Sequence, residues 1–598
     1  MVTDIPASTV ASPRGAREVR PTPRYGLWAF VAVCALAVLY LVTSARIESY
    51  GSDTSTYFGL AQSLRHQHAY WFDFAPHVTY PPGYPVLLAG LMSVVGENFA
   101  ALVRLSIPIF FLGLFGLYRL LELQWGSRIA SALVILAAVS GDAYFWSTVG
   151  LHSDVPYFTV SIFALLCFVL GERASTRGRR IAYRILVAVL ASYLVLLRSV
   201  GVTLVGGILL WMVYPVIPLW RTAGDSSLGR VRRWLPPSLL PLIVLVAWSA
   251  WTRQHAPPRT AGGDYMDSYG QQFLKEDPHQ IDSPMISVVK IPARVLRMAG
   301  TRATNAVHMV LNTPPVYLSA YNPLVLAFVL IVIVGFVSVA RHGGGGKGRG
   351  GTIVECYMLS YCALLVLYPF DEGSRYLLPI LPFLGLYGLE GIKAFSRLFR
   401  RVGRSTRGRF VVALGSDRLL AASLGVLFAL ITLGGLVRIN GLAHINLHPD
   451  PSSFTNAATQ RASEWVARNT RPGDVIMNDQ WAILHRLTNR KTVRFPLTTD
   501  PTVIAQRIAS DDVAYVVVLN EKRYEYYNPS MMRRFDVVRK QHASWFAPAH
   551  VFQDGTIYCV QRGEIPAIAS GAHGDLVHAV VSTTSLDPAM GPTAGEKR

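Results

Sequence analysis

Long apolar runs alternate with short basic linkers along most of the chain. Runs of roughly 17 to 25 residues can cross a bilayer as helices. The sequence contains eleven such runs, near 26-45, 100-118, 129-148, 155-171, 182-198, 200-219, 235-252, 321-340, 353-370, 376-392 and 411-437. With the N-terminus in the cytoplasm, the strongly basic linkers all fall on the cytoplasmic side, at 119-128, 172-181, 220-234, 341-351 and 393-410. Since cytoplasmic linkers carry the excess of Lys and Arg, the pattern predicts a polytopic α-helical membrane protein.

One apolar stretch does not fit this count. "PPGYPVLLAGLMSVVG" (81-96) is short and opens on Pro81 and Pro82, residues that suit the first turn of a helix. We interpret it as a helix that lies at the outer membrane surface. The alternative is a short twelfth span, which would place the Arg119/Arg128 linker outside and invert the topology that follows.

The part of the chain after the last run is hydrophilic and alternates between helical and strand patterns. "ASEWVARNT", "WAILHRLTNR" and "PTVIAQRIAS" have helical spacing, "VIMN", "TVRF" and "AYVVVLN" are typical of strands, and "HVFQDGTIYCVQ" predicts a hairpin that turns at Asp554-Gly555. We therefore expect a small extracytoplasmic α/β domain. The predicted organisation is a basic cytoplasmic tail (1-24), a membrane domain (25-437) with outer loops 46-99 and 253-320, the α/β domain (438-564) and a disordered tail (565-598).

Composition supports the membrane interpretation. Of 598 residues, 51% are hydrophobic and only 15% are charged, and the formal net charge is +20. Such an excess could reflect nucleic-acid binding, but the basic residues are confined to linkers between apolar runs, which favours a topological role and predicts no nucleic-acid partner. Four of the five cysteines lie in apolar runs, so no disulfide framework is expected.

Charged residues collect at the outer ends of the predicted spans. Asp53 follows the first span, Asp154 lies in "LHSDVPYF", Arg198 in "VLLRSVGVTL" and Arg375 in "DEGSRYLLPILP". Each has a simpler reading, because the acids could cap helices and the arginines could reach toward lipid headgroups. His152 is most simply a turn residue. Charged groups at membrane depth cost about 2.5 to 3.5 kcal/mol each, however, and four of them on one face predict a site.

This set of residue types suits a reaction in which a phosphate leaves and a hydroxyl attacks. A carboxylate can take the proton of the hydroxyl as general base, and an arginine can bind a phosphate with two hydrogen bonds and stabilise its charge. At a membrane surface, the substrate expected is a sugar on a polyprenyl phosphate, which the bilayer holds by its hydrocarbon tail.

The motifs "SDTSTYFGLAQSL", "YPPGYPVLLAGL", "LHSDVPYF" and "SRYLLPILP" together resemble the GT-C superfamily of integral-membrane glycosyltransferases. The nearest branch holds the protein O-mannosyltransferases and the aminoarabinose transferase of lipid A. The resemblance implies a hexosyl- or pentosyltransferase of the cytoplasmic (inner) membrane, active on its outer face, that moves a sugar from a polyprenyl-phosphate donor to an acceptor glycan, lipid or protein with inversion at the anomeric carbon.

The resemblance also implies roles for particular residues. Asp53 would be the general base, Asp154 a second acid that orients acceptor or sugar, Arg375 the contact to the donor phosphate and Arg198 a second such contact. Further candidates for substrate binding are Tyr57, Tyr80, His152 and Tyr376. Many relatives have Asp-Glu where this chain has Asp53-Thr54, and an Asp-x-Asp motif is absent, so no cofactor is expected and a divalent metal, although compatible with two acids, is not indicated.

Two other function classes remain open at the level of sequence. A transporter or flippase for lipid-linked saccharides predicts ionisable residues near mid-span and repeated halves, whereas here these residues lie at span ends and no repeat is visible. A non-catalytic membrane scaffold would tolerate the loss of Asp53.

Overall fold

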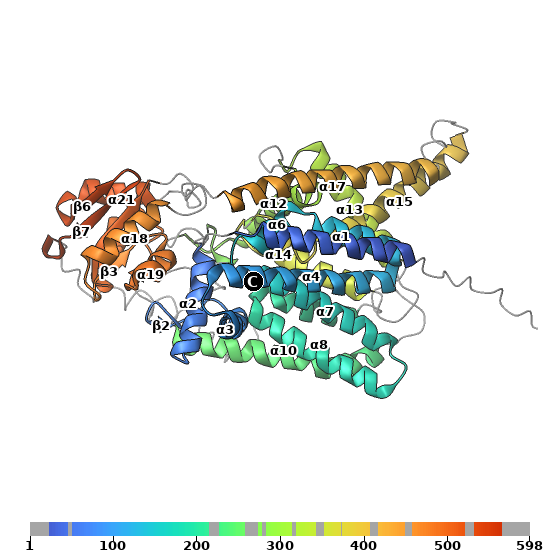
Figure 1. Ribbon diagram of the computed structural model, residues 1–598, viewed down its shortest axis with the longest axis horizontal. Coiled ribbons are helices and arrows are strands. Elements are labelled where there is room, and N and C mark those ends of the chain that lie inside the picture. Colours follow the sequence, from blue (N-terminus) through green and yellow to red (C-terminus); the bar gives the residue numbers. More distant parts are fainter. Residues whose placement is uncertain are drawn as a thin grey trace, which may run out of the picture.

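The computed structural model describes residues 23–45, 51–213, 227–256, 273–277, 283–313, 319–341, 352–371, 373–406, 417–448, 457–520 and 531–564. Helices run side by side through most of this chain, and a small α/β domain stands at one end of the bundle (Figure 1). This end, which also carries α2 and α3, is referred to below as the domain end. The predicted tails 1-24 and 565-598 lie outside the described residues, apart from the start of the first helix.

A helix occupies each of the eleven predicted spans. These helices are α1 (Pro23–Val42), α4 (Phe99–Trp125), α5 (Ser127–Ala138) with α6 (Gly141–Thr148), α7 (Asp154–Arg173), α8 (Arg177–Leu197), α9 (Val202–Val213), α10 (Ser227–His255), α13 (Pro323–Arg341), α14 (Ile353–Leu367), α15 (Leu381–Thr406) and α17 (Asp417–Leu447). Among the described helices, seven are long and apolar enough to cross a membrane, and the α5–α6 pair, bent by 57°, would be an eighth. The chain is a multi-pass membrane protein, as predicted.

Glycines allow two pairs of these helices to approach closely. A Cβ atom on Gly113 of α4 would overlap the side chains of Phe158 and Thr159 on α7, and one on Gly335 of α13 would overlap the carbonyl oxygen of Tyr387 on α15. In lipid, where the hydrophobic effect does not drive helices together, such close packing is a main source of helix association. These glycines therefore help to hold the bundle that positions the site.

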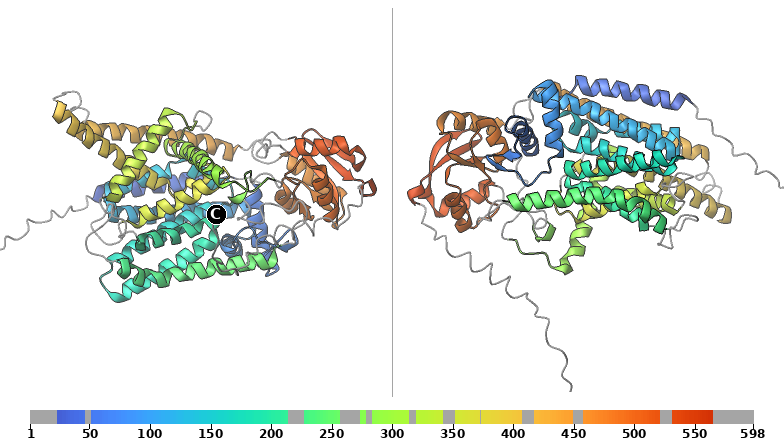
Figure 2. Two further views of the ribbon diagram at one scale, coloured as in Figure 1. Left: turned by 180° about the vertical axis from the view of Figure 1, so that it is seen from behind. Right: turned by 90° about the horizontal axis from the view of Figure 1, so that it is seen from below.

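Two short helices lie across the domain end of the bundle (Figure 2). α2 (Ser52–His66) follows the first span, and α3 (Gly83–Val95) begins directly after Pro81 and Pro82. α3 has 13 residues, which is short for a full span, and its location at the membrane surface stays a prediction. Between them, β1 (Trp71–Phe72) and β2 (Ala75–Pro76) form a small antiparallel hairpin.

The sequence did not predict α12 (Ile291–Leu311), which lies within the expected outer loop 253-320. One face of this helix is buried and includes Arg294, Arg302, Asn305 and His308. A search for uniformly apolar runs misses this helix because it contains many polar residues. A helix that packs by one face needs only one stripe of residues that are apolar or, if polar, paired with a partner.

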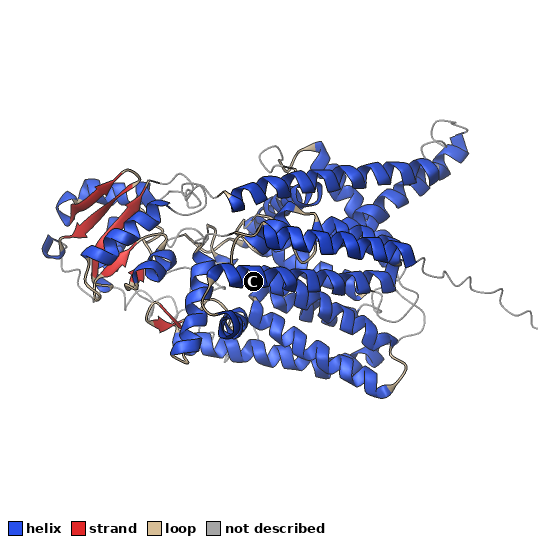
Figure 3. Ribbon diagram, viewed as in Figure 1, coloured by secondary structure: helices blue, strands red, loops and turns tan. Residues whose placement is uncertain are grey.

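The α/β domain contains one mixed sheet with helices around it (Figure 3). Its five strands are ordered β4-β3-β5-β7-β6, with β4, β3 and β5 parallel and β5, β7 and β6 antiparallel. Their bounds are β3 (Val475–Met477), β4 (Thr492–Val493), β5 (Val513–Leu519), β6 (Phe546–Phe552) and β7 (Gly555–Val560), and the helices are α18 (Ala457–Asn469), α19 (Trp481–Thr488), α20 (Pro501–Ser510) and α21 (Met531–Gln541). Each predicted element is present, and α21 is an addition.

The α/β domain contacts the membrane domain through the β1–β2 hairpin and α2. Asp73 accepts a hydrogen bond from the backbone N–H of Thr492 at 2.9 Å, and its carboxylate lies 3.0 Å from Nδ1 of His485. Phe72 packs edge-on against Trp481 and His485. Since α2 also carries Asp53, this contact connects the α/β domain to a helix that bears one of the predicted site residues.

The Asp73–His485 pair makes a pH-dependent contribution to this contact. Burial would lower the pKa of His485, but the Asp73 carboxylate outweighs it and raises that pKa above its ordinary value. The stabilisation is therefore complete below about pH 6.5, the ordinary pKa of histidine, and is lost as pH rises through the folded-state pKa. We expect the α/β domain of the full-length protein to become more susceptible to limited proteolysis as the pH rises above about 6.5. His485→Gln should remove this trend, and an identical trend in the variant would contradict the assignment.

Candidate active site

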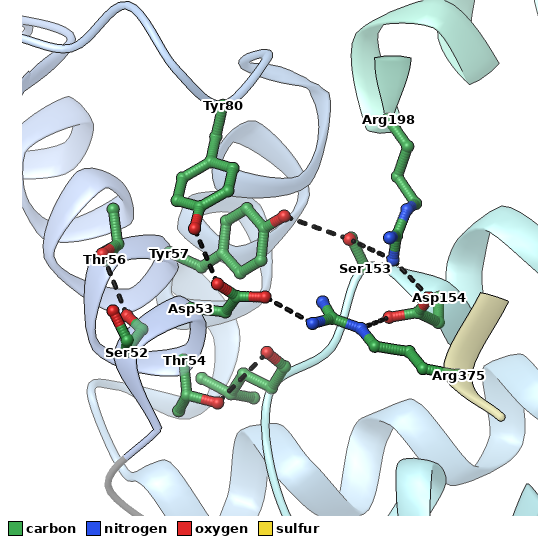
Figure 4. A network of polar contacts seen from close by, with 11 residues as sticks. Ser52, Asp53, Thr54, Thr56, Tyr57, Tyr80, Ser153, Asp154, Arg198 and Arg375 are labelled. Carbon is green, nitrogen blue, oxygen red and sulfur yellow. Dashed lines mark hydrogen bonds and ion pairs between the residues drawn. The ribbon is translucent and has the colours of Figure 1, made fainter. Parts of the chain in front are cut away.

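Side chains from five separate segments meet at the domain end of the bundle (Figure 4). The first two turns of α2 supply Asp53 and Tyr57, and the loop before α3 supplies Tyr80. The α6–α7 connection supplies His152 and Ser153, and α7 begins with Asp154. Arg198 follows α8 directly, and Arg375 and Tyr376 form the short 3-10 helix η7 (Arg375–Leu377) before α15. All eight site residues predicted from the sequence lie in this region.

Arg375 bridges the two carboxylates. Its Nη1 donates to Oδ2 of Asp53 at 2.5 Å, and its Nε donates to Oδ2 of Asp154 at 2.6 Å. The Asp154 side chain is 2% exposed and that of Arg375 9%, whereas that of Asp53 is 27% exposed. Asp53 is therefore the carboxylate of this bridge that a molecule in the surrounding space can reach.

Arg198 pairs with the other side of Asp154. Its Nη1 contacts Oδ1 of Asp154 and donates to the hydroxyl of Ser153 at 3.2 Å. The Arg198 guanidinium also lies over the ring of Tyr376, 4.9 Å from its centre. Asp154 thus holds two guanidinium groups, and the two acids and two arginines balance in charge.

Tyrosines complete the Asp53 side of the cluster. The Tyr80 hydroxyl donates to Oδ1 of Asp53 at 2.6 Å, and the ring of Tyr57 lies 4.9 Å from that of Tyr80. The Tyr57 hydroxyl is 3.1 Å from that of Ser153, where either can donate. Both oxygens of Asp53 therefore have partners, which orients the carboxylate.

His152 lies beside these charges but outside the hydrogen-bonded network. Its ring packs edge-on against Trp146 at 4.9 Å, and its buried Nδ1 has no hydrogen-bond partner. Burial, with an added contribution from Arg375, lowers the pKa of His152 to about 4. The ring is therefore neutral at physiological pH and can offer either a donor or an acceptor to a bound molecule.

Opposing effects set the charge state of Asp53. Burial would raise its pKa, but the Arg375 guanidinium and the Tyr80 hydroxyl outweigh burial and hold the pKa at about 2. Burial also raises the pKa of Tyr57 beyond its usual range, with the Asp53 charge adding to this effect. Asp53 is thus ionised and Tyr57 protonated across the physiological pH range.

The structure does not support the simpler readings of the two acids as helix caps. The N-cap position of α2 is Gly51 and that of α7 is Ser153, and neither helix has a side-chain cap hydrogen bond. Asp53 and Asp154 lie after these positions, inside the first turns, where they are free to point into the cluster. The arginines likewise pair with carboxylates within the protein.

Sequence reasoning missed two members of the site. Ser153 joins Tyr57 to Arg198, and Trp146 lies beneath Arg375, with the guanidinium carbon 5.8 Å from its ring centre. Ser153 stands next to Asp154 in the motif already quoted and could have been included on that ground. Trp146 gave no signal, since an aromatic residue in an apolar run is most simply part of the core.

Among the described residues, no group of three or more His, Cys, Asp or Glu side chains is arranged to hold a metal ion. Asp53 and Asp154 instead make their closest charged contacts with arginine.

Comparison with solved structures identifies the fold. The chain is similar to ArnT from Cupriavidus metallidurans bound to undecaprenyl phosphate, with a TM-score of 0.52 and 12% identity over 91% of this chain and 99% of that one. It is also similar to the archaeal oligosaccharyltransferase AglB from Archaeoglobus fulgidus in complex with an inhibitory peptide and a dolichol-phosphate, with a TM-score of 0.51 and 13% identity over 90% of this chain and 75% of that one. Both are GT-C membrane proteins. The likeness confirms the predicted GT-C-like fold.

No protein-family model and no curated protein matches the sequence. At such low identity a shared fold does not by itself transfer an activity, which has to be argued from the site.

Proposed function

We propose that this protein is a membrane glycosyltransferase that moves a sugar from a polyprenyl-phosphate donor to an acceptor hydroxyl, at the outer face of the cytoplasmic membrane. The observation that carries the proposal is the Arg375 bridge between Asp53 and Asp154 at the domain end of the bundle. It joins a reachable carboxylate by a hydrogen bond to a guanidinium group, which is a type of group that can bind phosphate. The solved structures with this fold include one bound to undecaprenyl phosphate and one bound to a dolichol-phosphate, which supports the donor class.

Asp53 acts as the general base. The acceptor hydroxyl gives its proton to the carboxylate while its oxygen forms a bond to the anomeric carbon of the sugar. The bond from that carbon to the phosphate oxygen breaks, and the polyprenyl phosphate leaves with the electron pair. Attack from the side opposite the phosphate inverts the configuration of the sugar.

Arg375 and Arg198 stabilise the negative charge that the phosphate gains as it leaves. Guanidinium groups form charge-assisted hydrogen bonds with phosphate oxygens, and preorganised donors cost little reorganisation when charge develops. The contacts of Asp154, which is buried and pairs with both arginines, favour a role in holding them in place. Its predicted role in orienting acceptor or sugar stays a prediction, as do the substrate contacts of Tyr57, Tyr80, His152 and Tyr376.

Donor binding also activates the base in this mechanism. In the ligand-free protein, the Arg375 guanidinium pairs with Asp53 and lowers the pKa of its carboxyl group. With so low a pKa, Asp53 is a weak base. A phosphate that recruits the guanidinium competes with Asp53 for it, and the pKa of Asp53 then rises toward its ordinary value. Two acids and two arginines balance in charge, so the one negative charge that the donor adds leaves three anionic groups to share two guanidinium groups, which favours a higher pKa for Asp53.

This exchange predicts different pH dependences for kcat/KM and kcat. The first reports the free enzyme and the second the enzyme–substrate complex. Because Asp53 has a pKa of about 2 in the free protein, kcat/KM should show no acid limb from Asp53 down to about pH 4. The pH profile of kcat should show an acid limb at about pH 4, the ordinary pKa of an aspartate, because the bound phosphate competes with Asp53 for Arg375. Rates measured with protein in lipid nanodiscs test this, and a limb near pH 6 in kcat/KM would show that another group takes the proton.

The assay that tests the proposed function follows release of polyprenyl phosphate. Membranes that contain the wild-type protein are supplied with a panel of radiolabelled polyprenyl-phosphate sugars and with acceptor extracts, and the released lipid phosphate and the labelled product are separated. We expect release that depends on both the protein and the acceptor, with an inverted anomeric configuration in the product. Absence of release with every lipid-sugar would contradict the proposal and favour a transporter or a scaffold.

A further inference from the structure

The turn that carries Arg375 is held from one side by α12. This turn, of which residues 368–371, 373 and 374 are described, connects α14 to η7, and no sequence motif explains why it should keep one conformation. Arg302 and Asn305 are three positions apart and therefore lie on the same face of α12. Both are buried, with 5% and 8% of their surfaces exposed. The face of α12 that carries them contacts the turn.

Asp371 is the residue of the turn at which these contacts meet. Its Oδ1 accepts from Nη1 of Arg302 at 3.2 Å and from the side-chain amide of Asn305 at 3.0 Å. The same oxygen accepts from the backbone N–H of Gly373 at 3.0 Å. Gly373 has φ of +64°, a left-handed conformation in which glycine avoids strain. Asp371 thus connects α12 to the backbone two residues before Arg375.

Arg302 also binds the backbone on either side of α14's end. Its Nε donates to the carbonyl of Leu365 at 3.5 Å and its Nη2 to the carbonyl of Phe370. The last carbonyls of a helix lack partners within that helix, so one guanidinium both completes the end of α14 and binds the turn beyond it. The Arg302 side chain therefore stabilises the backbone conformation between Leu365 and Asp371.

α12 itself is anchored to helices next to the site. His308 lies 3.4 Å from Asp142 of α6, and Arg438 of α17 pairs with the same carboxylate at 2.9 Å. Asn312, just after α12, accepts from the backbone N–H of Gly141 at 2.8 Å. α6 leads directly into the loop that bears His152 and Asp154. The same helix, α12, is therefore attached to the segments that present Asp154 and Arg375.

We propose that Arg302 and Asn305 are positioning residues, which hold Asp371 and thereby keep the Arg375 guanidinium between Asp53 and Asp154. The consequence for donor binding rests on the proposed function, whereas the effect on the turn does not. A purely structural role would be to stabilise the end of α14, which would change overall stability but not donor binding through Arg375.

The test compares Arg302→Gln with Arg297→Gln in the full-length protein. Arg297 is on the same helix but its side chain is exposed, so it controls for charge and helix propensity. Hydrogen–deuterium exchange should rise in peptides that cover residues 368–378 in Arg302→Gln and stay unchanged in Arg297→Gln. Binding of undecaprenyl phosphate should weaken by about tenfold in Arg302→Gln, a change expected to appear in donor KM more than in kcat.

A double variant shows whether Arg302 acts through Arg375. If it does, Arg302→Gln should weaken undecaprenyl phosphate binding no further when Arg375 is already Gln, because coupled residues are non-additive. Additive losses, or unchanged exchange at 368–378, would overturn the proposal. Should Arg302→Gln fail to fold, Asp371→Asn interrupts the same contact from a side chain that is 52% exposed. Failure of wild-type protein to bind any polyprenyl phosphate would overturn the proposed function instead, while the exchange measurement would still decide on the turn.

Discussion

Replacing Asp53 with Asn is expected to abolish sugar transfer while leaving the protein folded and able to bind polyprenyl phosphate. Asn has nearly the same shape, and its amide can keep a hydrogen bond with Tyr80, so the packing of α2 should not change. It cannot accept a proton from an attacking hydroxyl. Since a general base contributes roughly 10² to 10⁴-fold to a rate, release of polyprenyl phosphate from the labelled donor should fall by at least about a hundredfold.

The matched control is Glu97→Gln. Glu97 lies at the same end of the bundle and pairs with Arg65 and His66, away from the cluster. This variant should transfer sugar at close to the wild-type rate. Release at the wild-type rate by Asp53→Asn would rule Asp53 out as the base, and Asp154, the only other carboxylate bound to Arg375 among the described contacts, would be the next residue to test.

Replacing Arg375 is expected to have the largest combined effect on stability and activity. In Arg375→Gln, Asp154 keeps Arg198, but Asp53 loses its cationic partner and faces Asp154 without a charge between them. Breaking a buried ion pair by removing one partner typically costs about 3 to 5 kcal/mol, and the partial exposure of Asp53 places this case near the lower figure. Thermal unfolding in detergent should show a clear loss of stability. Donor binding should weaken but stay measurable, because Arg198 remains, and transfer should be lost.

Arg375→Lys separates charge from geometry. A lysine keeps the positive charge, but its ammonium is a single point and cannot reproduce the separate Nε and Nη1 contacts to two carboxylates. We expect it to recover most of the stability and only a small part of the transfer rate. Arg128→Gln, at the opposite end of the bundle where Arg128 stacks on Tyr25, should change neither. Full transfer by Arg375→Lys would show that charge alone suffices and that the bridge is not required.

Most of the membrane helices, and most of the residues that meet in the charged cluster, could be predicted because their signals are local. A membrane span is recognised by the length of its apolar run, and its orientation by the basic residues beside it, so residues near the ends of spans could be sorted by side from the sequence alone. The same reasoning missed α12, since its buried face carries arginine and asparagine that are paired with distant residues. It also left helix capping open as an alternative for Asp53 and Asp154, because whether an acid caps a helix depends on which residue begins that helix, and sequence patterns do not place this boundary to within one residue.

By itself, the sequence determined the multi-pass helical architecture, the alternating α/β domain and the collection of acids, arginines and tyrosines at one end of the spans. Only the tertiary structure decided how these groups pair. Asp53 and Asp154 meet Arg375 across 322 and 221 residues of chain, and Asp371 meets Arg302 across 69. Helix formation follows from hydrogen bonds and side-chain patterns within a few residues, whereas contacts over such distances depend on how whole helices pack, which no local pattern specifies.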